Sequence, residues 1–117
     1  MADVLLVDDE KNVLATLSLG LKKYNYSVKK AQSGSEALKI IEEEPCKVVV
    51  TDIRMNPMDG FTLAEKLFKR YNDINVIFMS AYSEDNEKFR SNFSCPRLTK
   101  PFDISELVEE IKKFLGK

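Results

Sequence analysis

The sequence predicts an α/β protein in which a five-stranded parallel sheet is covered by helices on both faces. Short apolar runs alternate along the whole chain with stretches in which apolar residues recur at helical spacing. The connections are short, and no internal repeat, low-complexity tract or linker interrupts the pattern. Such alternation is typical of parallel strands joined by right-handed helical crossovers. The 117 residues are the length of one domain, which we expect to span residues 1–117.

Five segments are predicted to be strands. Residues 4–7 form a continuous aliphatic run, as expected of a strand that is buried on both faces. Residues 47–51 and 75–79 have the same character, whereas residues 27–31 and 97–99 are weaker candidates. The first, third and fourth strands should therefore lie at the centre of the sheet.

The first two helices follow the first two strands. Apolar residues at helical spacing mark the first helix, which should end near two lysines. Its apolar positions are Val13, Leu14, Leu17 and Leu21. The second helix should start at a capping box, Ser33 to Glu36, and end before Pro45.

Three further helices are predicted. Asp59 is the expected N-cap of the third, whose inner face should be formed by Phe61, Ala64, Leu67 and Phe68. Residues 84–93 have helical propensity but few apolar anchors, so this helix should be the least stable. The last helix should start at a capping box, Asp103 to Glu106, and end at Gly116.

Composition excludes several kinds of chemistry. Histidine is absent, which excludes a Ser-His-Asp triad, a Cys-His dyad, a zinc site that needs imidazole, and a phosphohistidine carrier. The formal net charge of −1 argues against a broad basic surface for nucleic acid. Cys46 and Cys95 lack CxxC spacing and are interpreted as small buried hydrophobes rather than a disulfide or redox pair. No apolar run is long enough for a signal peptide or a membrane span, so we expect a cytoplasmic protein.

Polar residues gather at the predicted carboxyl ends of the strands. Asp8 and Asp9 follow the first strand, Asp52 the third, Ser80 the fourth and Lys100 the fifth. Taken singly, each has an ordinary interpretation as a helix cap, a turn residue or a solvated side chain. Together they occupy the edge at which open parallel sheets bind ligands. Clustered carboxylates need a cation, and Mg²⁺ prefers such oxygen ligands. Without histidine, a carboxylate is the expected nucleophile for a phosphoryl group, giving an aspartyl phosphate.

With these residues in place, the chain closely resembles the receiver domain of two-component response regulators. The resemblance covers essentially all of the sequence and rests on five motifs in order: residues 5–10 (LLVDDE), 51–55 (TDIRM), 58–60 (MDG), 80–81 (SA) and 99–102 (TKPF). It implies a flavodoxin-like doubly wound (βα)5 fold with strand order 2-1-3-4-5.

The resemblance also implies a role for each acid. Asp52 would accept a phosphoryl group from the phosphohistidine of a sensor histidine kinase or a phosphotransfer protein. Asp9 and Asp52 would bind Mg²⁺ directly, together with the backbone carbonyl of Arg54. Asp8 would act mostly through water. The protein would thus be a phosphoacceptor that assists its own phosphorylation and dephosphorylation, and not an enzyme acting on another substrate.

The remaining implied roles belong to the ends of the last two strands. Ser80 would hydrogen-bond the phosphoryl oxygens, Lys100 would pair with the phosphate, and the Lys100–Pro101 peptide bond would be cis. The added charge of about −1.5 to −2 would draw Ser80 and Lys100 inward and repack the surface beyond them. The resemblance also raises pairing of two copies through the last two helices.

Three features depart from the family pattern. Pro57 stands one position later than is usual after the acceptor. Arg97 occupies the position where the family usually has an inward-turning Tyr or Phe, and Phe93-Ser94 replaces the usual Gly-Ala upstream. We interpret Arg97 as a solvated or partner-contacting side chain rather than a substitute switch.

Two large side chains would flank the path of attacking water: Arg54, two residues after the acceptor, and Tyr82, two residues after Ser80. We interpret them as modulators that slow dephosphorylation.

Two other functions stay open at this stage. The departures at Arg97 and Phe93 allow an interaction module that has a receiver fold but works without phosphorylation. A Mg²⁺-dependent phosphatase is the weaker alternative, because Arg54 stands where a second acid would be needed. Direct binding of nucleic acid or membrane is not expected. The kinase, the effector or downstream partner, and whether the chain is complete or part of a longer regulator are not determined by these residues.

Overall fold

Five parallel strands form one sheet in the order β2-β1-β3-β4-β5. The structure is a computed structural model that describes residues 2–81 and 94–116. The strands are β1 (Val4–Val7), β2 (Val28–Ala31), β3 (Val48–Asp52), β4 (Asn75–Ser80) and β5 (Arg97–Thr99). The described helices are α1 (Lys11–Lys23), α2 (Gly34–Glu43), α3 (Gly60–Arg70) and α5 (Ile104–Leu115). The predicted fold class and strand order are confirmed, and the helix predicted at residues 84–93 lies outside the described residues.

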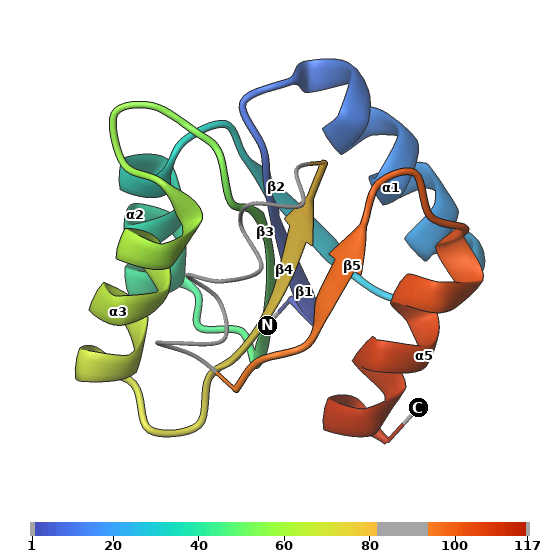
Figure 1. Cartoon of the computed structure of the whole chain (residues 1–117). Helices are drawn as coiled ribbons and strands as arrows, with labels where there is room; N and C mark the ends of the chain where they lie inside the picture. The colour runs from blue at the N-terminus through green and yellow to red at the C-terminus, as the bar shows by residue number, and fades with distance from the viewer. Residues whose placement is uncertain (1, 82–93, 117) are drawn as a thin grey trace.

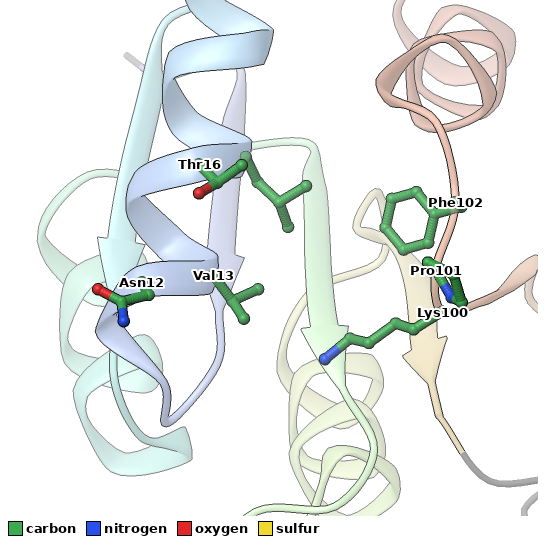
Figure 2. Close-up of a pocket in the computed structure, with 7 residues that line it drawn as sticks. Asn12, Val13, Thr16, Lys100, Pro101 and Phe102 are labelled. Atoms are coloured by element: carbon green, nitrogen blue, oxygen red, sulfur yellow. The ribbon is translucent and has the colours of Figure 1, made fainter.

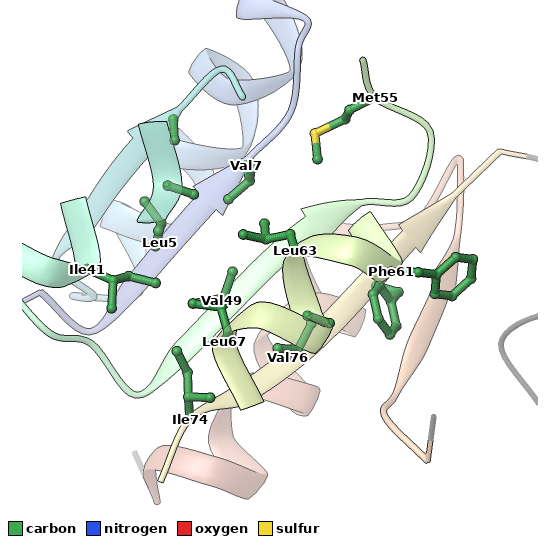
Figure 3. Packing of buried hydrophobic residues seen from close by; sticks show 14 of the residues in the cluster. Leu5, Val7, Ile41, Val49, Met55, Phe61, Leu63, Leu67, Ile74 and Val76 are labelled. Atoms are coloured by element: carbon green, nitrogen blue, oxygen red, sulfur yellow. The ribbon is translucent and has the colours of Figure 1, made fainter. Parts of the chain in front are cut away.

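The helices form a layer on each face of the sheet. In Figure 1, α2 and α3 lie on one side of the strands and α1 and α5 on the other. Alternate residues of β1 enter different cores: Leu5 and Val7 pack with α2 and α3, and Val4 and Leu6 with α1 and α5. Figure 3 shows the packing of the first of these cores. Because both faces of the central strands are buried, their sequences are apolar without alternation.

Side-chain caps fix the starts of α2 and α3, the helices that follow β2 and β3. The Ser33 hydroxyl accepts a hydrogen bond from the Glu36 N–H (3.1 Å), and the Asp59 carboxylate accepts one from the Thr62 N–H (2.8 Å). The Glu36 carboxylate accepts from Gln32, one residue before the cap, so the predicted capping box of α2 closes one residue early. These caps fix where α2 and α3 begin relative to β2 and β3.

The last helix agrees with its predicted boundaries. The Asp103 N–H donates to the Glu106 carboxylate (2.8 Å), as in a capping box. Gly116 ends α5 with φ of 73°, a left-handed conformation that glycine adopts without a side-chain penalty.

One predicted core position was wrong. Phe68 is 39% exposed, whereas Leu63 is fully buried in α3. Phe68 stands four residues after buried Ala64, so helical spacing alone permits it in the core, but it lies at the margin of the buried face, whereas Leu63 lies within that face.

The cysteine prediction was right in its main point. Cys46 and Cys95 are both free thiols, the first buried and the second half-buried. Burial raises the pKa of the Cys46 thiol to about 11, so it stays protonated and unreactive at neutral pH. Within residues 2–81 and 94–116, no helix has the length and apolar character needed to cross a membrane.

Candidate functional site

Three carboxylates meet at the carboxyl end of the sheet. Asp8 and Asp9 directly follow β1, and Asp52 is the last residue of β3, the strand that pairs with β1. One oxygen from each of the three carboxylates lies within 4.8 Å of the others. Asp8 is fully buried and Asp52 is 9% exposed, whereas Asp9 is exposed. The adjacency of β1 and β3 therefore brings together acids that are more than forty positions apart in the sequence.

Asp8 is held rigidly at the base of this cluster. Its N–H donates to the Ala31 carbonyl at 3.1 Å, which extends the pairing of β1 with β2. Its carboxylate accepts from the Glu10 N–H at 2.9 Å and from the Lys100 ammonium at 3.1 Å. These partners satisfy hydrogen-bonding groups of a carboxylate that has no access to solvent.

Lys100 connects the far edge of the sheet to the acids. Its Nζ lies 3.1 Å from Asp8 Oδ2 and 3.6 Å from Asp52 Oδ1. Its own N–H donates to the Ser80 carbonyl (2.8 Å), which fixes the backbone where the side chain departs. Figure 2 shows this side chain extending from the end of β5 toward the end of β3. The Lys100–Pro101 peptide bond is cis, as the resemblance implies.

The site carries more negative than positive charge. Burial raises the pKa of Asp52 to about 6; Lys100 opposes this rise, and the charges of Asp8 and Asp9 add to it. Burial lowers the pKa of Lys100, but Asp52 and Asp8 outweigh that effect, so the pKa of Lys100 is raised. One ammonium therefore does not neutralise the three acids, and a further cation would favour the ionised form of Asp52.

This donor set suits Mg²⁺. All three side chains offer hard carboxylate oxygens, and exposed Asp9 leaves one side of the cluster open to solvent. Mg²⁺ prefers oxygen ligands and keeps some of its water. The residues present therefore fit the ion that the resemblance implies.

Ser80 lies at the same edge of the sheet. It is the last residue of β4, is 1% exposed, and stands opposite Thr99 in the pairing with β5. Asp52 stands opposite Met79, one residue before Ser80. The structure thus places Ser80 one step beyond Asp52 on the neighbouring strand.

The loop after Asp52 is tightly packed. Ile53 and Met55 are buried, and the Gly60 N–H donates to the Ile53 carbonyl at 2.8 Å. A side chain at Gly60 would place its Cβ 2.4 Å from the Asp52 carbonyl oxygen, so only glycine fits there. The Asn56–Pro57 peptide bond is also cis, a feature that the sequence did not predict.

Arg54 follows the end of β3, and Arg97 is the first residue of β5. Arg54 is exposed in the loop after β3. Arg97 is half-buried, and its guanidinium donates to Thr99 Oγ1 at 2.8 Å along the same strand. Tyr82 and Phe93 lie outside the described residues, so the predictions for them stay untested.

Sequence reasoning missed an apolar pocket beside Lys100. A cavity of about 390 Å³ lies between the first turns of α1 and the segment after β5. It is lined by Asn12, Val13, Thr16, Leu17, Lys100, Pro101 and Phe102, most of them labelled in Figure 2. The apolar residues that follow the lysine in the sequence, Pro101 and Phe102, were a signal, but only the packing of α1 beside the segment after β5 shows that they line one pocket.

The family model described as "Response regulator receiver domain" matches residues 4–112. The sensor kinase CckA of Brucella abortus is 40% identical over an alignment of 122 positions, which covers 99% of this chain and 13% of that protein. The heme response regulator HssR of Staphylococcus aureus is 34% identical, and the alignment covers 98% of this chain and 52% of that protein. The chain thus spans about half of one relative and a small part of the other.

Solved structures agree with the fold. The response regulator TrrA of Thermotoga maritima, in complex with Mg²⁺-BeF, superimposes with a TM-score of 0.87 at 31% identity, covering 97% of this chain and 99% of that one. A two-component transcriptional regulator AraC from Clostridium phytofermentans gives a TM-score of 0.86 at 34% identity, covering 99% and 93% of the two chains.

Proposed function

Because this chain belongs to the response regulator receiver domain family, we propose that Asp52 is its phosphoacceptor. The observation that carries this proposal is the ion pair at the end of β3. Asp52 is the carboxylate of the cluster that belongs to the central strand, and Lys100 Nζ lies 3.6 Å from its Oδ1. Its partial exposure leaves the carboxylate accessible to a donor, whereas Asp8 is fully enclosed.

The acids around Asp52 are proposed to hold Mg²⁺. Asp9, Asp52 and the backbone carbonyl of Arg54 would be direct ligands, with Asp8 acting through water. When bound, the ion would neutralise charge on the carboxylates and on the phosphoryl oxygens. The fit of the donor set and the raised pKa of Asp52, to about 6, both support this assignment.

The transfer itself depends on positioning. An ionised oxygen of Asp52 attacks the phosphorus of the donor's phosphohistidine; the P–O bond forms, and the P–N bond breaks as the imidazole leaves. Lys100 pairs with a phosphoryl oxygen, and Ser80 donates a hydrogen bond to another. Phosphoryl transfer needs little more than alignment and charge neutralisation, which these residues supply.

The product changes the charge of the site. An acyl phosphate brings about −1.5 to −2 in place of one carboxylate. Lys100, now 3.1 Å from Asp8, gains a competing anion, and its backbone is bonded to Ser80. Movement of Lys100 would therefore also move the ends of β4 and β5. A partner that binds there would distinguish the phosphorylated from the unphosphorylated protein.

Finer parts of the function are proposed on the same basis. The donor is a sensor histidine kinase or a phosphotransfer protein, since this chain has no histidine of its own. The protein acts as a phosphoacceptor within one domain, in the cytoplasm, and without direct contact to nucleic acid or membrane. The net charge of −1 supports the absence of a broad nucleic-acid surface.

The test is phosphorylation by a small phosphodonor in the presence of Mg²⁺. We expect one phosphoryl group per chain by intact mass, and none for Asp52→Asn. Asp59→Asn is the matched control, because asparagine also caps a helix and Asp59 precedes α3 rather than ending β3. Persistent labelling of Asp52→Asn would contradict the assignment.

A second function is favoured by one observation. Arg97 stands at the usual position of the aromatic switch. Its guanidinium donates a hydrogen bond to Thr99 of the same strand (2.8 Å), so the side chain is held along β5 rather than turned toward Ser80 as a switching aromatic residue would be. A receiver fold that binds partners without phosphorylation would tolerate this. Beryllofluoride with Mg²⁺ should shift the backbone amide resonances of Ser80, Thr99 and Lys100 if the site switches. Under the second function these resonances stay in place.

A further inference from the structure

Gly34, the first residue of α2, packs against Met58 in the loop between β3 and α3. A Cβ placed on Gly34 would lie 2.5 Å from Met58 Sδ, 3.1 Å from its Cγ and 3.2 Å from its Cβ. Gly34 is buried, and Met58 packs against the core cluster that includes Ala37 and Ile41 of α2. The Met58 side chain therefore occupies the space that any larger residue at position 34 would need.

Rotation of Met58 does not remove this conflict completely. Its Sδ and Cγ can turn away about side-chain bonds, but Cβ is attached directly to the loop backbone. A contact of 3.2 Å to that atom can be relieved only if the loop or the start of α2 moves. The start of α2 is held by the Ser33 cap and by buried Ala37 and Ile41, so we expect the loop to move.

The loop that would move is the one that follows Asp52. At its start the Ile53 N–H donates to the Met79 carbonyl (3.0 Å), and at its end the Gly60 N–H donates to the Ile53 carbonyl (2.8 Å). Arg54 lies between these two anchors. The contact of Met58 with Gly34 adds a third point of attachment, which joins the loop to the start of α2.

We propose that Gly34 and Met58 are positioning residues for the acid site: their contact fixes the course of the loop and so the direction of the Arg54 carbonyl. The inference rests on the proposed function, in which that carbonyl is a ligand of Mg²⁺. Neither residue touches the reacting atoms. Their effect on the metal passes through the backbone of residues 53–58.

The experiment compares Gly34→Ala with Gly20→Ala. Gly20 is a matched control, because a Cβ there would lie 2.9 Å from Ile104 Cγ1, a similar conflict between α1 and α5 that does not involve the loop. In the metal-free proteins, Gly34→Ala should shift the backbone amide resonances of residues 53–59, and Gly20→Ala should not. Mg²⁺ titration followed by the same resonances should give a dissociation constant about tenfold higher for Gly34→Ala, in the range seen when groups that orient metal ligands are removed. Gly20→Ala should bind Mg²⁺ like the wild type.

Met58→Ala separates positioning from crowding. This substitution removes the contact between Met58 and Gly34 without introducing a clash, so it should also weaken Mg²⁺ binding several-fold. If Gly34→Ala does not fold, Met58→Ala alone tests whether the contact positions the loop. The double variant removes the conflicts with Sδ and Cγ and keeps only the 3.2 Å approach of the two Cβ atoms, so it should recover much of the thermal stability lost in Gly34→Ala but not the Mg²⁺ affinity. Wild-type affinity in Met58→Ala or in the double variant would overturn the proposal, as would unshifted loop resonances in Gly34→Ala. If the wild-type protein itself bound no Mg²⁺, the proposed metal site would fail, whereas the metal-free spectra would still decide whether Gly34 positions the loop.

Discussion

Asp52 must be ionised to act as a nucleophile or a metal ligand, yet its surroundings disfavour the charge. Burial and the charges of Asp8 and Asp9 raise the pKa to about 6 against the opposing effect of Lys100. A group in this position lowers the stability of the fold when it is charged. That cost is typical of sites in which function, rather than stability, determines the residue.

The first prediction concerns pH and stability. Because the folded-state pKa of Asp52 is raised from 3.8 to about 6, its favourable contribution is complete below pH 4 and is lost as the pH rises to about 6. Without divalent ions, Asp52→Asn should be more stable than the wild type at pH 7 by about 1 to 2 kcal/mol, a range reduced for solvent screening. At pH 4 the two proteins should have nearly the same stability. Urea unfolding at both pH values measures the difference, and a difference that does not change with pH would contradict the argument.

The same pKa predicts how Mg²⁺ binding depends on pH. Protonation of Asp52 removes one ligand charge, so affinity should fall as the pH decreases through about 6. In Asp52→Asn this step should be absent from the pH profile. Titrations from pH 5 to 8 followed by NMR test this, and a profile unchanged by the substitution would assign the titration to another group.

A third prediction at the residue scale concerns the lifetime of the phosphoryl group. Arg54 is exposed beside the site and carries no carboxylate to orient water, and Tyr82 has the same property by its residue type. Self-dephosphorylation should therefore be slow, with a half-life well above seconds. Arg54→Asp should speed hydrolysis by at least about tenfold, since a positioned base contributes this much or more. Arg70→Asp, the same charge change at the end of α3, should have no effect. Equal dephosphorylation rates in the two variants would show that Arg54 does not control hydrolysis.

At the scale of elements, α1, the helix that follows Asp8 and Asp9 in the sequence, contains an unusual residue. Ser18 of α1 is 3% exposed, and its hydroxyl has no hydrogen-bond partner within residues 2–81 and 94–116. The surrounding positions of the same face, Leu14 and Leu21, are buried and apolar. Among the described residues, the helix thus carries a buried polar group whose loss of hydration no hydrogen bond compensates.

Replacing this hydroxyl tests that view. Ser18→Ala should leave stability unchanged or raise it by up to about 1 kcal/mol, because alanine has higher helix propensity and no group to desolvate. Ser35→Ala in α2, where the serine is exposed, is the control for helix propensity alone. A clear loss of stability in Ser18→Ala, measured by denaturant unfolding, would show that the hydroxyl does have a partner.

At the scale of the whole molecule, the sheet has two edges, β2 and β5. Lys29 and Lys30 of β2 are exposed, and Lys29 forms an ion pair with Glu44. Charged side chains on an edge strand discourage pairing with another chain. These lysines therefore account for a polar strand in a sheet whose central strands are mostly apolar.

The last prediction follows from this edge. Lys29→Val combined with Lys30→Val should raise β propensity, remove the charges, and cause association that increases with protein concentration. Lys29→Arg with Lys30→Arg keeps the charges and should behave like the wild type. Sedimentation velocity over a range of concentrations measures the difference. Pairing of wild-type copies through the last two helices stays a separate prediction.

Much of the fold could be predicted because it is encoded by neighbouring residues. Continuous apolar runs identified the buried strands, and capping residues such as Asp59 and Asp103 placed the helix starts close to their observed positions. Phe68 was misassigned because helical spacing permits either side of a helix face, and only packing against β3 and β4 selects Leu63 instead. Local patterns therefore determine the type of an element better than its rotation.

The sequence by itself determined the fold class, the acids at the strand ends and the absence of any histidine that could carry the phosphoryl group. Only the tertiary structure decided that Lys100 lies 3.1 Å from Asp8, that three carboxylates share one 4.8 Å neighbourhood, and that Met58 lies against Gly34. The reason is physical. Helix and strand patterns arise from interactions over a few residues, whereas these contacts join segments that become neighbours only when the sheet has formed. The charge balance of the site, and with it the pKa of Asp52, exists only in that assembled state.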